Sequence, residues 1–301
     1  MSTLYTLTRG DAPLVVNIPH GGTWVPAELR PLMQAEALGV PDTDWHVDRL
    51  YDFVRARGVT LMAATHSRYV IDLNRDPDGG VLYPGASNTE LCPTTRFDGG
   101  PVWKDEAAGH LLLDVAARRR QYFDPYHAQL AAELARVQAR HGYAVLLDGH
   151  SIISHCARFF DGKLPDLNLG TADGASCPPG LQQAAAQALQ ADGFTAAVNG
   201  RFKGGWITRH YGRPAEGYHA LQLEMALSAY MTEQAPFHWQ PERAEPLRQV
   251  LETLVAALLA WRCLGGVDAS CSGVARISWH RLGVGSSGRC ERKPTHARPT
   301  G

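Results

Sequence analysis

The sequence predicts a three-layer α/β fold, in which a mixed, mostly parallel twisted sheet is flanked by helices. Short apolar runs, such as those at 14–18 and 143–148, have the length of strands that are buried on both faces of a sheet. Amphipathic segments of helical length alternate with these runs along the chain. Several runs end in polar residues, and open α/β sheets bind their ligands at the carboxyl ends of strands.

The composition is that of an ordinary globular protein. The chain has 301 residues and a net charge of -1, so we expect one α/β domain over 1–264 and neither nucleic acid nor an anionic membrane as a partner. No apolar run approaches the roughly 20 residues that cross a bilayer. The six cysteines form no CxxC pair, and the N-terminus lacks the pattern of a secretory signal. We therefore expect a cytoplasmic protein with reduced thiols.

The first predicted strand leads directly into a histidine. It covers 14–18 and is followed by Pro-His-Gly-Gly, in which the histidine is His20 and the glycines let the backbone turn. A helix is predicted over 45–57, because an Asp-Thr-Asp sequence offers an N-cap to an apolar stripe. Asp44 and Asp48 are four residues apart, which places both carboxylates on one face near the start of this helix.

The next segments combine strands with a long loop. Strands are predicted over 59–65 and 69–73, and the second ends in Asp-Leu-Asn-Arg, which contains Asn74 and Arg75. From 76 to 102 the chain is rich in Gly, Pro, Asn and Thr without periodicity. An uninterrupted loop of this length inside a compact domain is usually functional.

A helix and a buried strand make up the middle of the chain. The helix is predicted over 104–141, with a break near Asp124-Pro125. The strand over 143–148 runs into Gly-His-Ser, so His150 lies just beyond its end. Asp148 is either a hydrogen-bond partner of His150 or a cap at the end of the strand.

The second half continues the alternation. An irregular Gly- and Pro-rich stretch over 152–179 precedes a helix over 181–192 and a strand over 194–199. A glycine-rich loop over 203–218 follows, and it carries Arg209, His210 and Arg213.

The last ordered elements are a strand and a long helix. Alternation over 220–226 favours a strand that places Gln222 and Glu224 on one face. An amphipathic helix over 241–263 closes the domain. The composition then changes to Gly, Ser, Arg and Thr, so we expect 265–301 to be a disordered tail.

Polar residues that could bind a ligand or react thus lie at the ends of four predicted strands: His20, Asn74-Arg75, His150 and Glu224. A single histidine is more often a core residue than a ligand, but two histidines with acids at strand ends describe a catalytic metal site. Zinc in hydrolases is commonly held by two His and one carboxylate, while a further Glu acts as base. An Asn-Arg pair suits a substrate carboxylate, which Arg binds through a bidentate fork.

These residues carry a resemblance to a known family. The order of His20, an acid, Arg68, Asn74-Arg75, His150 and Glu224 resembles that of the zinc carboxypeptidase and aspartoacylase superfamily, whose fold is phosphorylase/hydrolase-like. Longer segments are similar to the N-formylglutamate amidohydrolase family and cover roughly 12–262: NIPHGG, TDWHVDRLYDF, SRYVIDLNRDP, LCPTTRFDGGPVW, LLDGHS, GGWITRHYG and HALQLEMALSAYM.

The resemblance implies a divalent metal, with Zn²⁺ preferred and Co²⁺ or Fe²⁺ as alternatives. Its ligands would be His20, His150 and one acid. The wider superfamily has a His-x-x-Glu pair, but this chain has Thr23 three residues after His20, so the acid must come from elsewhere. Asp48 is the preferred third ligand and Asp44 the second choice.

The activity that the resemblance implies is hydrolysis of N-formyl-L-glutamate to formate and L-glutamate, a step of histidine degradation. Glu224 would accept the proton of the attacking water, and Arg68 would stabilise the oxyanion. The substrate is a small dianion, so each of its two carboxylates needs a cationic partner. Asn74-Arg75 would bind one carboxylate and Arg209 or Arg213 the other.

Three alternatives stay open. A related metal amidohydrolase would remove an acetyl, succinyl or formimino group from an acidic amino acid. A ligand-binding protein would keep the pocket without catalysis. A cysteine nucleophile, Cys92 or Cys156, lacks a recognisable activating partner. Arg96 on the first long loop is a further candidate for a substrate carboxylate, and no pattern in the chain indicates an oligomeric state.

Overall fold

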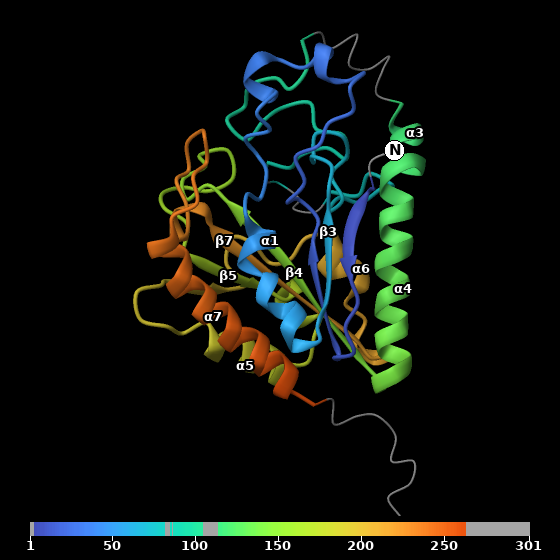
Figure 1. Ribbon diagram of the computed structural model, residues 1–301, viewed down its shortest axis with the longest axis vertical. Helices are drawn as coiled ribbons and strands as arrows, with labels where there is room; N and C mark the ends of the chain where they lie inside the picture. The colour runs from blue at the N-terminus through green and yellow to red at the C-terminus, as the bar shows by residue number, and fades with distance from the viewer. Residues whose placement is uncertain (1–2, 82–84, 86, 105–113, 263–301) are drawn as a thin grey trace, which may run out of the picture. The chain divides into compact units, whose positions relative to one another are not determined.

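The computed structural model describes residues 3–81, 85, 87–104 and 114–262 (Figure 1). These residues form a seven-stranded sheet with the order β1-β3-β2-β4-β7-β5-β6. The strands are β1 (Tyr5–Thr8), β2 (Leu14–Ile18), β3 (Thr60–Ala64), β4 (Ala144–Ile152), β5 (Leu167–Gly170), β6 (Ala196–Val198) and β7 (Tyr218–Ala226). Four of the six strand pairings are parallel and two, β1·β3 and β5·β7, are antiparallel. The predicted mixed, mostly parallel sheet is confirmed.

Helices cover both faces of this sheet (Figure 1). The α-helices are α1 (Val47–Leu50), α3 (Val115–Arg118), α4 (Asp124–His141), α5 (Pro179–Ala188), α6 (Trp206–Tyr211) and α7 (Pro241–Ala260). Apolar residues of α1, α5 and α7 join one buried cluster, and those of α4 and α6 join a second. The described residues therefore form the three layers that the sequence predicts.

The central strand β4 shows why two cores form. Val145 and Leu147 pack into the cluster with α5 and α7, whereas Ala144 and Leu146 pack into the cluster with α4. Successive side chains of a strand point to opposite faces, so an apolar run without alternation requires cover on both sides. All nine residues of β4 are buried, as the sequence pattern indicates.

The prediction of a strand over 69–73 is wrong. This segment is a buried loop rather than a strand, although its apolar side chains belong to the core. Side chains from the helical layer bind its backbone carbonyls: Arg118 donates to the carbonyl of Val70 at 2.8 Å, and Nε2 of His127 contacts that of Leu73 at 2.9 Å. Because side chains satisfy these groups, the segment is buried without a neighbouring strand.

Several boundaries also differ from the predictions. The helix over 45–57 divides into α1 and a 3₁₀ segment over Asp52–Arg57, and the break near Pro125 is a π turn over Arg119–Phe123 within a continuous helical run. The loop over 203–218 contains α6, which the sequence analysis did not predict, and β1 and β5 were also missed. Residues 105–113 of the predicted 104–141 helix and the expected tail over 265–301 lie outside the described residues.

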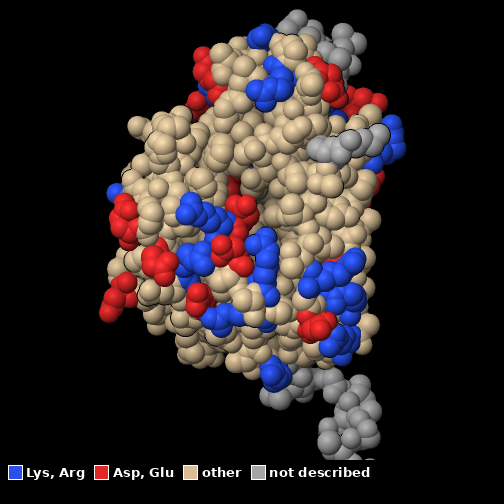
Figure 2. All heavy atoms as spheres, in the orientation of Figure 1, with Lys and Arg blue, Asp and Glu red and all other residues tan. Residues whose placement is uncertain are grey.

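Charged side chains are interspersed on the face that Figure 2 shows, where basic and acidic residues alternate over its lower half. Ion pairs join the Asp52–Arg57 segment to α7: Arg57 to Glu252 at 3.0 Å and Arg248 to Asp52 at 2.9 Å. Among the described helices, none combines the length and the apolarity that crossing a membrane requires.

Candidate metal centre and pocket

The candidate site forms where one face of the sheet changes from apolar to polar. In β4, Leu146 packs in the core, and Asp148 and His150 follow on the same face at intervals of two. In the neighbouring β7, Ala220 is followed in the same way by Gln222 and Glu224. His150 and Glu224 are register partners in the parallel pair, so their side chains lie next to each other. The sequence analysis placed His150 beyond the strand, but β4 extends to Ile152.

A second histidine and an aspartate complete a buried group. His20 lies two residues after β2, and its backbone carbonyl accepts a hydrogen bond from the backbone N–H of Asp44 at 3.0 Å. Oδ2 of Asp44 lies 3.0 Å from Nδ1 of His150 and 3.8 Å from Nδ1 of His20. One potential ligand atom from each of these three residues lies within 4.8 Å of the others, so they could hold a metal ion together.

The preference for Asp48 as the third ligand requires correction. Asp48 is exposed on α1, whereas Asp44 is 1% exposed and faces both histidines. The predicted shared helix face does not exist, because α1 begins only at Val47 and His46 before it has a left-handed φ of 60°. Asp44 therefore lies in a non-helical segment that returns to the end of β2. The second choice is the one that the geometry supports.

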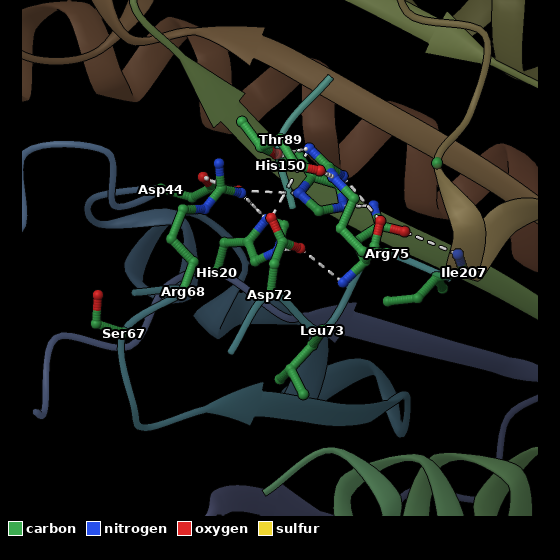
Figure 3. Close-up of polar contacts among 12 residues, drawn as sticks. His20, Asp44, Ser67, Arg68, Asp72, Leu73, Arg75, Thr89, His150 and Ile207 are labelled. Atoms are coloured by element: carbon green, nitrogen blue, oxygen red, sulfur yellow. Dashed lines mark hydrogen bonds and ion pairs between the residues drawn. The ribbon is translucent and has the colours of Figure 1, made fainter. Parts of the chain in front are cut away.

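A carboxylate lies at Nε2 of each histidine ring, and Figure 3 shows the one beside His20, Asp72. Nε2 of His20 donates to Asp72 at 2.7 Å, and Nε2 of His150 donates to Asp148 at 2.8 Å. Nδ1 of His150, whose pKa is raised, donates to Oδ2 of Asp44 at 3.0 Å, and loss of this proton would turn Nδ1 into a metal ligand. Nδ1 of His20, whose pKa is lowered, is already an acceptor. A carboxylate behind a ligating histidine fixes the tautomer and the orientation of the ring. Of the two roles left open for Asp148, the structure shows the hydrogen-bond partner of His150.

A series of hydrogen bonds connects His150, through the sheet, to helix α4. Nδ2 of Asn17 donates to Oδ1 of Asp148 at 2.7 Å, and the hydroxyl of Tyr126 donates to Oδ1 of Asn17 at 2.6 Å. All three residues are fully buried. These hydrogen bonds were not predicted, although Asn17 is a polar residue inside the apolar run of β2.

The pKa shifts of His20, Asp44 and His150 show that this buried group contains negative charge that could bind a cation. Burial alone would lower the pKa of His150, but Asp148 and Asp44 raise it well above its usual value. Burial and Arg68 lower the pKa of His20 to about 4. Burial would raise the pKa of Asp44, but Arg68 and His150 lower it. Two imidazole nitrogens and one ionised carboxylate are a ligand set that suits a divalent transition metal. The residues present therefore fit the metal that the sequence predicts.

Arg68 reaches this group from the buried loop. One of its terminal nitrogens, Nη2, contacts Nδ1 of His20 and lies 3.7 Å from Oδ1 of Asp44 (Figure 3). Burial would lower the pKa of Arg68, but Asp72, Asp44 and other carboxylates raise it. The guanidinium is thus charged and directed at the histidines.

Glu224 is a buried carboxyl group beside the two histidines. It is 7% exposed, and Nε2 of Gln222 lies 3.4 Å from its Oε2. Burial raises the pKa of Glu224 to about 8. A carboxylate with a raised pKa accepts a proton more readily than an ordinary one, which is the property of a general base.

Asn74 is held by the start of α6, and Arg75 by the loop that carries Thr89. Oδ1 of Asn74 accepts from the backbone N–H of Ile207 at 2.7 Å, and its Nδ2 lies 3.0 Å from Nε2 of His150. A Cβ at Gly205 would come within 2.3 Å of Nδ2, so this approach requires glycine. Arg75 donates to the hydroxyl of Thr89 at 2.6 Å, which orients its guanidinium.

These residues line one pocket that opens to solvent and has a cavity volume of about 70 Å³. Its lining consists of His20, Arg68, Asn74, Arg75, Ser87, Phe97, His150, Ser151, Ile152, Phe159, Arg201, Phe202, Gly205, Gln222 and Glu224. The pocket thus brings together both histidines, the predicted base and three arginines.

Two predicted arginines do not line the pocket, and this part of the prediction is corrected. Nε of Arg209 donates to the carbonyl of Gly204 at 3.1 Å, and Arg213 forms an ion pair with Glu216 at 3.0 Å. The unpredicted helix α6 accounts for the error, because it directs Arg209 to the exposed side. Arg96 is likewise paired with Asp98, at 3.0 Å. Arg201, which the sequence analysis missed, lines the pocket.

The geometry does not favour the alternative in which a cysteine is the nucleophile. Cys92 and Cys156 are buried and are not among the residues that line it. Burial raises the pKa of both thiols, which lowers the population of the nucleophilic thiolate.

Comparison with known proteins identifies the family. The sequence pattern of N-formylglutamate amidohydrolases matches residues 12–231, most of the chain. The chain belongs to the N-formylglutamate amidohydrolase family. The N-formylglutamate deformylase of Pseudomonas putida is 46% identical over 266 residues, which cover 87% of this chain and 97% of that protein. The deformylase of Pseudomonas aeruginosa is also 46% identical, over 87% of this chain and 98% of its own length.

A solved structure of the family and a more distant protein have the same fold. The crystal structure of N-formylglutamate amidohydrolase from Ralstonia eutropha JMP134 is 31% identical and aligns with a TM-score of 0.69, covering 84% of this chain and 97% of that one. The gene product Atu2144 of Agrobacterium tumefaciens shares the fold at 16% identity, with a TM-score of 0.65 over 85% of this chain and 95% of its own. The resemblance seen in the sequence is confirmed.

Proposed function

We propose that this amidohydrolase hydrolyses N-formyl-L-glutamate to L-glutamate and formate, a step of histidine degradation. The observation that carries the proposal is the buried group of His20, Asp44 and His150, which lies beside Glu224 in a pocket with three arginines. Family membership supports the same reaction, because relatives that align along nearly their whole length are N-formylglutamate deformylases.

We infer that His20, Asp44 and His150 hold a divalent cation, with Zn²⁺ as the first choice. A cation of this kind supplies a Lewis acid for the formyl oxygen and a water of lowered pKa. Asp72 and Asp148 keep the two rings in the ligating tautomer by accepting from their Nε2 atoms. The same residues would hold Co²⁺ or Fe²⁺, because the donor set is shared by these metals.

Glu224 moves the protons in this proposal. As water attacks the formyl carbon, the carboxylate of Glu224 accepts one of its protons, and it then donates that proton to the nitrogen as the C–N bond breaks. Formate leaves with the oxygen of water, and the amino group of glutamate is released. Arg68, whose guanidinium lies at the histidines, stabilises the negative charge that develops on the formyl oxygen.

Asn74 and Arg75 bind one carboxylate of the substrate. Arg75 lines the pocket, and Thr89 holds its guanidinium in place, so a carboxylate can bind without reorganisation of the side chain. Asn74 contacts both His150 and α6, so it positions the carboxylate relative to the metal ligands.

The acyl group is tested by comparing N-formyl-, N-acetyl- and N-succinyl-L-glutamate as substrates of the purified protein. We expect kcat/KM for the formyl compound to exceed that for the acetyl compound by about 100-fold, because an added methyl group at a tight site costs roughly that much. Release of acetate or succinate in place of formate would assign the protein to another deacylase. Metal binding without hydrolysis of any of the three would indicate a binding protein.

A further inference from the structure

Arg201 lies on the pocket wall formed by the segment between β6 and α6. Its Nε donates to the backbone carbonyl of Phe159, and its guanidinium lies 5.3 Å from the ring centre of Phe202. Both aromatic residues also line the pocket. The charged end of Arg201 is therefore held at an aromatic part of the lining.

The backbone on both sides of Arg201 is fixed to the end of β5. Before it, the backbone N–H of Asn199 donates to the carbonyl of Leu169 at 2.8 Å. After it, the carbonyl of Lys203 accepts from the backbone N–H of Ala172 at 2.6 Å. These anchors keep the segment in one place, so ordering Arg201 on ligand binding costs little.

The lining of the pocket matches a flexible dianion. Three arginines and one carboxyl group, that of Glu224, are among the lining residues, which gives an excess of positive charge. The rings of Phe97, Phe159 and Phe202 provide an apolar wall. Methylene groups between two carboxylates would pack against such a wall, while each carboxylate would meet an arginine.

Arg75 and Arg201 differ in their contacts with the residues around the proposed metal ligands. Arg75 adjoins Asn74, which contacts His150, and its own Nη2 lies 3.8 Å from Asp72, the partner of His20. Arg201 comes from a different segment and contacts aromatic residues instead. In an N-formyl amino acid, the α-carboxylate is attached to the carbon that bears the amide nitrogen, and the side-chain carboxylate is several bonds further away. With the amide at the metal ligands, the α-carboxylate would therefore be on the side of Arg75.

We propose that Arg201 binds the side-chain carboxylate of the substrate and thereby sets the preference of the site for acidic over neutral N-formyl amino acids. This assignment rests on the proposed function. It replaces Arg209 and Arg213 in the role that the sequence analysis gave them.

The test compares Arg201→Met with the wild-type protein on N-formyl-L-glutamate and N-formyl-L-glutamine, which differ only at the side-chain carboxylate. The loss of one charge-assisted bidentate contact is expected to lower kcat/KM for the glutamate compound roughly 50-fold, mainly through KM. For the glutamine compound we expect kcat/KM to change by less than about 3-fold, because this substrate has no side-chain carboxylate for Arg201 to bind. Equal losses on the two substrates, or no loss on either, would overturn the assignment.

Lys203→Met is the matched control. Lys203 is cationic and lies in the same segment, but it forms an ion pair with Asp173 at 3.0 Å and does not line the pocket. We expect its kinetic constants on both substrates to equal those of the wild type. A loss of preference in Lys203→Met equal to that in Arg201→Met would show that net charge, rather than Arg201 itself, sets the preference.

Binding of glutarate, measured by calorimetry, separates this inference from the proposed function. Glutarate carries the two carboxylates of glutamate without an amide, so its binding does not depend on hydrolysis. Weaker binding to Arg201→Met, by roughly 50-fold, would support the dicarboxylate site even if the wild type released no formate. Unchanged binding in the variant, or no binding to the wild type, would overturn the inference while leaving the formate assay to decide the proposed function.

Discussion

Replacing Asp44 by Asn is expected to abolish stoichiometric metal binding, whereas the same replacement of Asp48 leaves it intact. Asp44 is buried and lies 3.0 Å from Nδ1 of His150, and its amide would lack the charge that a divalent cation requires. Replacing an outer-shell residue of a metal site typically costs 10- to 100-fold in affinity, so loss of a direct ligand should cost more than about 100-fold. Metal content after dialysis against Zn²⁺ measures the effect.

The Asp48 variant is the matched control, because it makes the same chemical change four residues further along the chain. Asp48 is exposed on α1, so both metal content and activity should equal those of the wild type. Loss of metal from Asp48→Asn with retention in Asp44→Asn would restore the ligand that the sequence analysis preferred and refute the assignment of Asp44.

Replacing Glu224 by Gln is expected to lower kcat for N-formyl-L-glutamate by about 10³-fold while the metal stays bound. The variant keeps the shape of the side chain but cannot accept a proton, and a positioned general base contributes 10²- to 10⁴-fold. KM should change little, because no proposed carboxylate-binding residue is altered. Steady-state kinetics and metal content on the same sample measure both effects.

Glu216→Gln provides the control for loss of one carboxylate. Glu216 pairs with Arg213 at the surface and does not line the pocket, so its replacement should leave kcat unchanged. Retention of more than about a tenth of wild-type kcat in metal-loaded Glu224→Gln would fall outside the range for a general base and exclude Glu224 from that role.

The parts of the site that lie on strands could be predicted from the sequence. His20 follows β2, and His150 and Glu224 lie on β4 and β7, where hydrophobic runs and alternation give both the strand and the face. Their meeting follows from parallel packing, because carboxyl ends of parallel strands share one edge of the sheet. The layers of the fold were predicted correctly because the uninterrupted apolar runs require helices on both faces of the sheet.

The parts of the site that lie on irregular segments could not be predicted in this way. Asp44 and Asp48 are equivalent under a helical pattern, and only the left-handed backbone at His46 separates them. The loop that carries Arg68 and Asp72 has the apolar composition of a strand. It can be a buried loop because side chains that are distant in sequence bind its backbone carbonyls, and local periodicity does not indicate such contacts. Arg201 lies between two of the quoted motifs, LLDGHS and GGWITRHYG, so neither the motifs nor periodicity indicated it.

Formate release from N-formyl-L-glutamate, measured before and after metal removal, tests the central claim most directly. The purified protein would be treated with a chelator, dialysed, assayed, and assayed again after addition of Zn²⁺ or Co²⁺. We expect formate release to fall to background on chelation and to return with the added metal, because His20, Asp44 and His150 would again hold the cation. Full activity in protein that chelation has left free of metal would contradict the account.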